Sequence, residues 1–231
     1  MVKVYVAMRN SGNEKDAFKF SSLEPAYKNF IKYIHDGDSK VSSGIGSCPV
    51  VRDWYKNTFI FRSFLDLDVS YTDSSFSVDF HTNDPRVADD LYSIEGPSII
   101  EIYNDHSFAA YCEEPLIMET TQYSSDFPLA PCRFDIGKWL RSPHPAIVNP
   151  KLRNLSIKRG EPMMYVRFLT DEPVEIVECD WTPEIEQLHL TCGKVRNVKA
   201  RMGLNKLYEL FVSSTMKRKV TRAFKAAVLG D

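Results

Sequence analysis

The sequence predicts a chain of the α+β class: a mainly antiparallel β sandwich or barrel with an N-terminal helix and a C-terminal helical segment. Short apolar runs that alternate with polar residues recur between residues 58 and 178, separated by Gly, Pro, Asp or Asn. Of the 13 prolines only Pro183 lies beyond residue 173, which suits edge strands and turns better than a parallel βαβ sheet. After residue 180 the apolar spacing becomes helical. We therefore expect a β-rich domain over residues 1–180 and a basic helical segment over residues 181–231.

The N-terminal region predicts a strand and then a helix. Val2, Val4 and Val6 alternate with their neighbours at the period of a half-buried strand. Residues 24–36 place their apolar side chains on one helical face, with Ser21 or Ser22 as the N-cap. The next predicted element is a short amphipathic turn that follows Cys48 and Pro49.

The central region predicts a series of short strands. The first contains Phe59 and Phe61, and a hairpin follows in which residues 65–71 face residues 76–80 across a turn at 72–75. The remaining predicted strands cover residues 98–103, 107–112, 116–123, 133–140, 155–158, 162–169 and 173–178.

The C-terminal region begins with a helix-start signal. Thr182 is a good N-cap, Pro183 suits the first helical position, and Glu184 makes the first turn acidic. We expect the helical segment to break near Gly193 and again near Gly203. The apolar face after the second break consists of Leu204, Leu207, Leu210 and Phe211.

Composition and charge exclude several classes of protein. The chain has 231 residues, 43% of them hydrophobic and 26% charged, which excludes disordered, collagen-like and coiled-coil proteins. The net charge of −2 argues against non-specific nucleic-acid binding and against a membrane-surface role. The charge is nevertheless uneven. Residues 193–231 carry ten basic and two acidic residues, a net charge of +8, which leaves −10 on residues 1–192.

Five cations near the C-terminus form a candidate basic binding surface: Lys217, Arg218, Lys219, Arg222 and Lys225. They could contact the phosphates of a nucleic acid, with an affinity that depends on salt. They could also form a solvated helix face or dock on the acidic body. The second interpretation is favoured, because amphipathic helices normally carry Lys and Arg on their solvent side.

The number and spacing of the cysteines, together with the lengths of the apolar runs, indicate the cellular compartment of the protein. The five cysteines are odd in number and scattered, with no CxxC pair, so a disulfide scaffold and a zinc ribbon are not indicated. The first residues lack the continuous apolar stretch of a signal peptide, and no run approaches the roughly 18 residues of a membrane span. We expect a protein that acts or assembles in a cytoplasm, with no membrane partner.

Two groups of residues could carry catalysis. Cys48 precedes a short helical turn, and a helix N-terminus lowers the pKa of a thiol; the alternative is a small buried side chain at a turn. His81, Asp84 and His106 could supply a non-haem iron or zinc site, whereas turn chemistry explains the Asn83-Asp84-Pro85 segment equally well. The sequence therefore does not identify a cofactor.

The absence of several sequence motifs narrows the possible classes of enzyme further. The sequence holds no P-loop, GxGxxG turn, GxSxG elbow or HExxH helix, which removes the most readable enzyme classes. One set of aromatic residues is assigned to core and subunit packing instead of to base stacking, because acidic residues surround it. The set consists of Trp54, Tyr55, Phe59, Phe61 and Phe64.

Three sequence blocks carry a resemblance to a known family: CPVVRDWYKNTFIFRSFLDLDV from residue 48, RFDIGKWL from residue 133 and IKRGEPMMYVRFLTDEPVEI from residue 157. In these blocks the chain resembles a family of uncharacterised proteins that tailed bacteriophages encode, with relatives in some bacterial genomes. The resemblance covers residues 48–178 and leaves out the C-terminal helices. It implies a viral setting, hence the host cytoplasm or the virion, and it implies no catalytic residues.

Two functional hypotheses follow. The first is a non-catalytic phage-encoded protein, either a virion component or a protein-binding factor, whose partner is another protein or a second copy of the chain. A nucleic-acid partner of the C-terminal helices is a variant of it that the charge pattern does not favour. The alternative is an enzyme on a β scaffold that depends on a metal ion (non-haem iron or zinc) or on a thiol.

Overall fold

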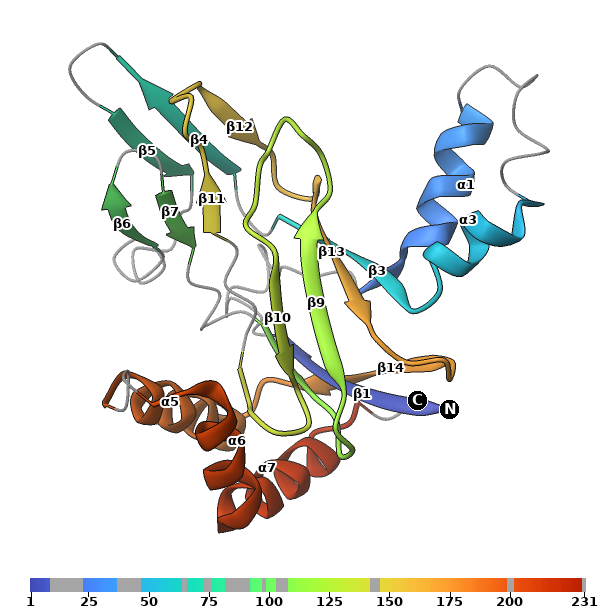
Figure 1. Cartoon of the computed structure of the whole chain (residues 1–231), viewed down its shortest axis with the longest axis vertical. Coiled ribbons are helices and arrows are strands. Elements are labelled where there is room, and N and C mark those ends of the chain that lie inside the picture. Colours follow the sequence, from blue (N-terminus) through green and yellow to red (C-terminus); the bar gives the residue numbers. More distant parts are fainter. Residues whose placement is uncertain are drawn as a thin grey trace.

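A computed structural model describes residues 1–8, 23–36, 47–63, 66–72, 76–81, 92–96, 99–102, 108–141, 146–198 and 202–229. In these residues the strands lie in the centre and upper part of Figure 1, and helices α5, α6 and α7 lie beneath them. Helices α1 and α3 project to one side. The helices are α1 (Ala26–Asp36), α3 (Pro49–Trp54), α5 (Pro183–Val198), α6 (Leu204–Ser213) and α7 (Thr215–Ala226).

The described strands form four sheets. The largest has the order β10-β9-β13-β3-β2, with β10 (Cys132–Asp135), β9 (Ile117–Gln122), β13 (Pro162–Phe168), β3 (Thr58–Arg62) and β2 (Glu24–Pro25). A second has the order β14-β1-β8, with β14 (Val174–Asp180), β1 (Val2–Met8) and β8 (Phe108–Tyr111). The third consists of β12 (Leu155–Ile157), β4 (Asp66–Tyr71) and β5 (Phe76–His81), and the fourth of β11 (Ala146–Val148), β7 (Ile99–Ile102) and β6 (Tyr92–Gly96).

The predicted α+β class with antiparallel sheets is confirmed. Strands β4 and β5 form the predicted hairpin, in register from Tyr71 opposite Phe76 to Asp66 opposite His81. The barrel alternative is wrong, because none of the four sheets closes on itself within the described ranges. Each sheet ends at edge strands, so the described strands form no continuous ring of hydrogen bonds of the kind that a barrel requires.

One strand pair differs from the antiparallel expectation. Strand β1 pairs in parallel with β14, from Val2 opposite Val174 to Met8 opposite Asp180, while β8 lies antiparallel on its other side. The two parallel strands stand at opposite ends of the β-rich part of the chain. Local periodicity cannot reveal such a pairing, because the alternation of one strand does not say which strand it joins.

Strand β1 is buried on both faces from Val4 to Ala7. Val4 and Val6 of β1 pack into one hydrophobic cluster with side chains of the five-stranded sheet, such as Phe61. Tyr5 and Ala7, which point the other way, pack into a second cluster with the C-terminal helices. The half-buried strand predicted here is therefore wrong: the helices remove the second face of β1 from water.

The C-terminal helices begin and break largely as the sequence predicts. The Thr182 hydroxyl caps α5 by accepting a hydrogen bond from the Ile185 amide at 3.2 Å. Helix α5 ends at Val198 and Gly203 is the N-cap of α6, so the second expected break is confirmed. The break expected at Gly193 is wrong. Glycine weakens a helix interior but does not interrupt its hydrogen bonds, and α5 continues through this position.

Replacing Gly193 by alanine is therefore expected to stabilise the protein. An added Cβ would meet no atom within 4 Å, and the backbone here is already helical. Alanine restricts the unfolded chain and favours the helix by about 0.5–1 kcal/mol. Urea unfolding of the variant should show a higher midpoint with an unchanged slope. A lower midpoint would mean that this face of α5 is covered.

Helix α1 lies within the range predicted for a helix, after the two residues of β2. A polar network joins it to the edge of the large sheet. The Arg62 guanidinium donates to Glu24 at 2.8 Å and to Asn29 at 3.0 Å, and Asn29 also donates to Glu24. The hydrogen bonds from Asn29 and Arg62 lower the pKa of Glu24. The network holds α1 beside β3.

Candidate functional site

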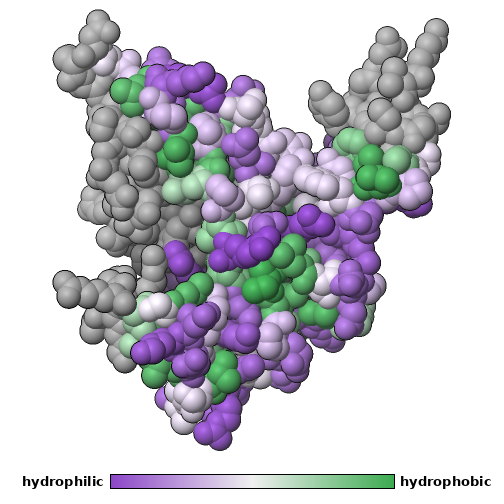
Figure 2. Space-filling model, in the orientation of Figure 1, coloured by the Kyte–Doolittle hydropathy of each residue, from purple (hydrophilic) through white to green (hydrophobic). Residues whose placement is uncertain are grey.

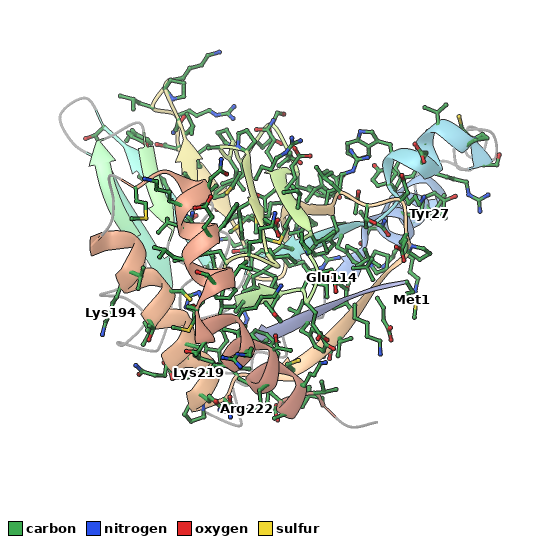
Figure 3. The ribbon with its side chains drawn as sticks, turned by 60° about the horizontal axis from the view of Figure 1, so that its bottom comes forward. Met1, Tyr27, Glu114, Lys194, Lys219 and Arg222 are labelled. Atoms are coloured by element: carbon green, nitrogen blue, oxygen red, sulfur yellow. The ribbon has the colours of Figure 1, made fainter. Side chains whose placement is uncertain are left out.

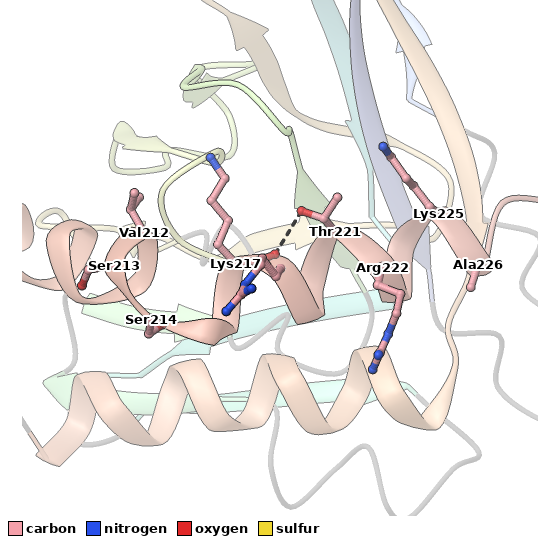
Figure 4. Close-up of a pocket in the computed structure, with 9 residues that line it drawn as sticks. Val212, Ser213, Ser214, Lys217, Thr221, Arg222, Lys225 and Ala226 are labelled. Carbon is pink, nitrogen blue, oxygen red and sulfur yellow. Dashed lines mark hydrogen bonds between the residues drawn. The ribbon is translucent and has the colours of Figure 1, made fainter.

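A groove of about 850 Å³ runs along α7 and contains most of the predicted basic binding surface. Four cations line it together with hydroxyl and apolar side chains of α6 and α7. Figure 4 shows Lys217 and Lys225 extending to one side of α7 and Arg222 to the other. The lining residues are Val212, Ser213, Ser214, Lys217, Arg218, Thr221, Arg222, Lys225 and Ala226. Lys219 belongs to the same helix but does not line the groove.

The apolar face of α7 determines where these cations point. Val220, Ala223 and Phe224 are buried at the i, i+3 and i+4 spacing of one helical face. Phe224 packs against Tyr5 and Tyr111, with ring centroids 6.5 and 5.5 Å away. The opposite face, which carries the lysines and arginines, is consequently turned outward.

Hydrogen bonds fix α7 further. The Thr221 hydroxyl lies 2.6 Å from the hydroxyl of Tyr111 on β8, and it donates to the Lys217 carbonyl at 3.0 Å. Ser214 caps the helix by accepting from the Met216 amide at 3.1 Å. The groove is thus built on a helix whose position and rotation are set by the sheet beneath it.

Two of the five cations form ion pairs with acidic residues of neighbouring elements. Arg222 lies 3.2 Å from Glu184 of α5, and Lys225 lies 2.9 Å from Glu113. The hydrogen bond to Glu113 raises the pKa of Lys225. Both pairs are solvent-exposed, so water and salt screen them and they contribute little stability. Docking on the acidic body, which the sequence suggested together with a solvated helix face, therefore accounts for these two cations.

The other three cations have no acidic partner among the residues that the structure describes. Lys217, Arg218 and Lys219 follow one another at the start of α7, and Arg218 and Lys219 are exposed. Figure 3 shows Lys219 and Arg222 on the helices, far from Tyr27 at the projecting end of the molecule. The cationic groove keeps uncompensated positive charge.

A second candidate surface lies at the other end, where α1 and α3 meet the large sheet. Trp54 of α3 packs edge-on against Tyr55 at 4.8 Å and against Tyr165 of β13 at 5.7 Å between ring centroids. Tyr123 extends the group, 5.0 Å from Tyr165, and Phe30 stacks on Tyr55 at 4.9 Å. We call Phe30, Trp54, Tyr55, Tyr123 and Tyr165 the aromatic surface.

This surface is partly open to solvent. Trp54 is 48% exposed and Val50, one turn before it on α3, is 77% exposed. Figure 2 shows hydrophobic side chains at the outside of this projecting end. Burial, followed by the hydrogen bond with Tyr55, raises the pKa of Tyr165, so its phenol stays protonated and adds no charge to the aromatic surface.

The predicted role of the aromatic residues in packing is confirmed only in part. Phe59 and Phe61 are buried in the core, as expected. Trp54 is not buried, because α3 has no buried residue and carries its indole at the edge of the sheet. Phe64 lies outside the described residues. Sequence reasoning missed Tyr123 and Tyr165; the alternation of Tyr165 with Met164 and Val166 is the signal that places it on the outer face.

Cys48 lies where a reactive thiol was predicted, at the N-cap of α3. Its side chain makes no capping hydrogen bond, and the helix that follows has only six residues. The alternative of a buried side chain is wrong, because Cys48 is half-buried. Burial raises the pKa of Cys179 and of Cys192 to about 12, and it raises the pKa of Cys112 as well.

These environments predict a clear order of thiol reactivity. At pH 8, Cys48 should react with iodoacetamide before Cys179 and Cys192, which need unfolding to react. A pKa of about 12 reduces the thiolate fraction about a thousandfold relative to an ordinary cysteine, and burial blocks access in addition. Mass spectrometry of each cysteine peptide over time measures the rates. Equal rates at Cys48 and Cys192 would contradict the packing of α5.

The residues of the predicted metal site are not brought together in the described part of the chain. His81 is the last residue of β5, opposite Asp66, while Asp84 and His106 lie outside the described residues. Among the residues whose side chains are placed, no group of three His, Cys, Asp or Glu could hold a metal ion. The metal site stays a prediction.

Comparison with known proteins identifies no relative of this chain. No family model, curated protein or solved structure matches the chain. Each helix in the described ranges is too short or too polar to cross a membrane. The two surfaces described above, cationic and aromatic, are therefore the features on which a functional interpretation depends.

Proposed function

We propose that the protein is a non-catalytic, phage-encoded binding protein, a virion component or a protein-binding factor, which docks a protein partner on the aromatic surface. The observation that carries the proposal is the half-exposed indole of Trp54, held by rings on the sheet behind it. Trp, Tyr and Arg dominate the energetics of protein interfaces. Because Tyr55 and Tyr165 already fix Trp54, docking would cost little side-chain entropy.

The surroundings of Trp54 support the same proposal. Val50 adds an exposed apolar side chain on the same helix, and Arg52 lies over the ring of Tyr27, 5.8 Å from its centroid. An apolar centre with a charged margin is the usual composition of a docking surface. For the body we propose a sandwich, in which the large sheet and β14-β1-β8 enclose the hydrophobic cluster that they share.

Light scattering over a concentration series, combined with iodide quenching of tryptophan fluorescence, tests the proposal. Of the three tryptophans Trp54 is exposed, Trp181 is half-buried and Trp139 is buried, so the quenching is measured in a Trp181→Phe background, in which Trp54 dominates the signal. If the partner is a second copy, the mass should rise with concentration and Trp54 should become protected. Trp54→Ala should abolish the rise in mass, whereas Leu204→Ala, which removes an exposed apolar side chain at the start of α6, should show the same rise as the intact protein.

A different protein partner is detected by photocrosslinking. A photoreactive amino acid at position 50 should give a defined adduct in phage-producing cells and in purified particles. The adduct should disappear in the Trp54→Ala background, and the same probe at position 204 should not form it. A monomer that gives no adduct from position 50 and is absent from particles would overturn the proposal.

The enzyme hypothesis remains a prediction without an observation that favours it. Cys48 is the N-cap of a helix of only six residues, and two of the three proposed metal ligands lie outside the described residues. Metal analysis of protein purified without chelator tests it directly: a stoichiometric iron or zinc ion would support it over the binding protein.

A further inference from the structure

The cationic groove contains more basic side chains than the ion pairs of the described structure involve. Between Glu209 and Asp231 the sequence has five cations and no acidic residue. Two of the cations pair with carboxylates of the body, and Lys217 and Arg218 line the groove with no acidic partner in the described part of the molecule. We propose that this groove binds the sugar–phosphate backbone of a nucleic acid, without reading its sequence.

The arrangement of the cations fits a polyanion with regular spacing. Lys217 and Lys225 form one row along α7, with Thr221 between them, and Arg218 and Arg222 form a second row. At 1.5 Å per helical residue the first row spans about 12 Å, roughly the rise of three to four nucleotides of one strand. In Figure 4 the labelled members of the two rows extend to opposite sides of the helix.

The support beneath α7 favours binding without rearrangement. Phe224 and Val220 are fully buried, and Thr221 is tied to Tyr111, so the helix does not have to be ordered when a ligand arrives. The hydroxyls of Ser213 and Thr221 already donate to helix carbonyls. Contacts to the ligand would therefore come mainly from the cations, which bind phosphate and carry no base-specific information.

Nucleic acid is favoured over an acidic protein because the groove is a charged, open surface. An acidic protein partner would also need an apolar anchor, and the groove offers only Val212 and Ala226 for this, because the large hydrophobic side chains of α7 are turned inward against the sheet. The pairs of Arg222 and Lys225 are exposed, so a dense phosphate backbone can compete with Glu184 and Glu113 for them. The net charge of −2 does not prevent this, because screening limits the reach of the acidic body to about 10 Å at moderate salt.

Fluorescence anisotropy with a labelled oligonucleotide of mixed sequence, single- or double-stranded, tests the inference over a salt series. The intact protein should bind with log K falling linearly with log salt at a slope of about −3 for three to four phosphate contacts. Lys217→Ala and Arg218→Ala should each reduce the magnitude of the slope by about 1, equally for unrelated sequences. Circular dichroism confirms that the variants keep their helices.

Lys219→Ala is the matched control. It removes the same charge from the same helix, one or two residues away, at a position that does not line the groove. If the slope changes as much for Lys219→Ala as for Lys217→Ala, binding depends on the total positive charge of the helix and not on the groove, and the inference is overturned. Binding that is absent or independent of salt would do the same.

A polyglutamate competitor separates the two kinds of polyanion. If it displaces the oligonucleotide at equal charge concentration, the site selects acidic protein and the nucleic-acid assignment is wrong. The result is independent of the proposed protein docking, because α7 and α3 lie at opposite ends of the molecule (Figure 1). Trp54→Ala should therefore leave oligonucleotide binding unchanged.

Discussion

Replacing Phe224 by alanine is expected to lower the free energy of unfolding by about 3–5 kcal/mol. Phe224 has no exposed surface, and its ring packs between Tyr5 of β1 and Tyr111 of β8. The cavity would lie inside the cluster that joins the helices to the sheet β14-β1-β8. Neighbouring rings are held by their strands, so the site can collapse only partly.

Urea unfolding followed by circular dichroism and by tryptophan fluorescence measures this effect. Arg218→Ala, an exposed position on the same helix, should change the stability by no more than about 0.5 kcal/mol. If Phe224→Ala melts the helical signal while the core fluorescence persists, the helices unfold as a separate unit. A loss below about 1 kcal/mol would show that α7 does not dock on the sheet.

Gly137→Ala is expected to destabilise the protein by about 3 kcal/mol, near the upper end for overpacking. A Cβ at this position would overlap the Glu114 carbonyl group and approach the Pro115 Cα to 3.0 Å. These are backbone atoms, so no side chain can rotate away. The close approach is enforced by Asp135, whose carboxylate accepts hydrogen bonds from the Leu116 and Gly137 amides at 3.0 Å.

The matched control for Gly137→Ala is the same substitution at Gly193, which meets no neighbouring atom. The two variants should move the urea midpoint in opposite directions, although the chemical change is identical. A neutral Gly137→Ala would mean that the segment 114–116 can shift away from the turn after β10, and the network around Asp135 would then need another explanation.

The elements whose pattern is local could be predicted well. The β4–β5 hairpin follows from two alternating runs on either side of a polar turn, and the start of α5 follows from Thr182 and Pro183. The parallel pairing of β1 with β14 could not, because it joins segments more than 160 residues apart. The same difficulty hid the second buried face of β1, whose Tyr5 and Ala7 are covered by helices from the end of the chain.

The candidate sites divide in the same way. The cations of α7 could be named from charge alone, since no acidic residue interrupts them. Which of them find a carboxylate depended on the position of Glu113 and Glu184, residues of other elements. The aromatic surface combines rings from α1, α3, β13 and the residue after β9, and its members look like ordinary strand and helix aromatics when each is read alone.

Residue order along the chain was sufficient for the class of fold, the start of α5 and the charge of the last helix, because short-range periodicity and capping depend on neighbours within a few positions. Packing between distant segments was required to expose Trp54, to bury both faces of β1 and to leave Lys217 and Arg218 without carboxylates in the described structure. Hydrophobic burial is non-directional, so one apolar pattern in the sequence is compatible with packing against many different segments. Only the folded structure shows which segment it packs against.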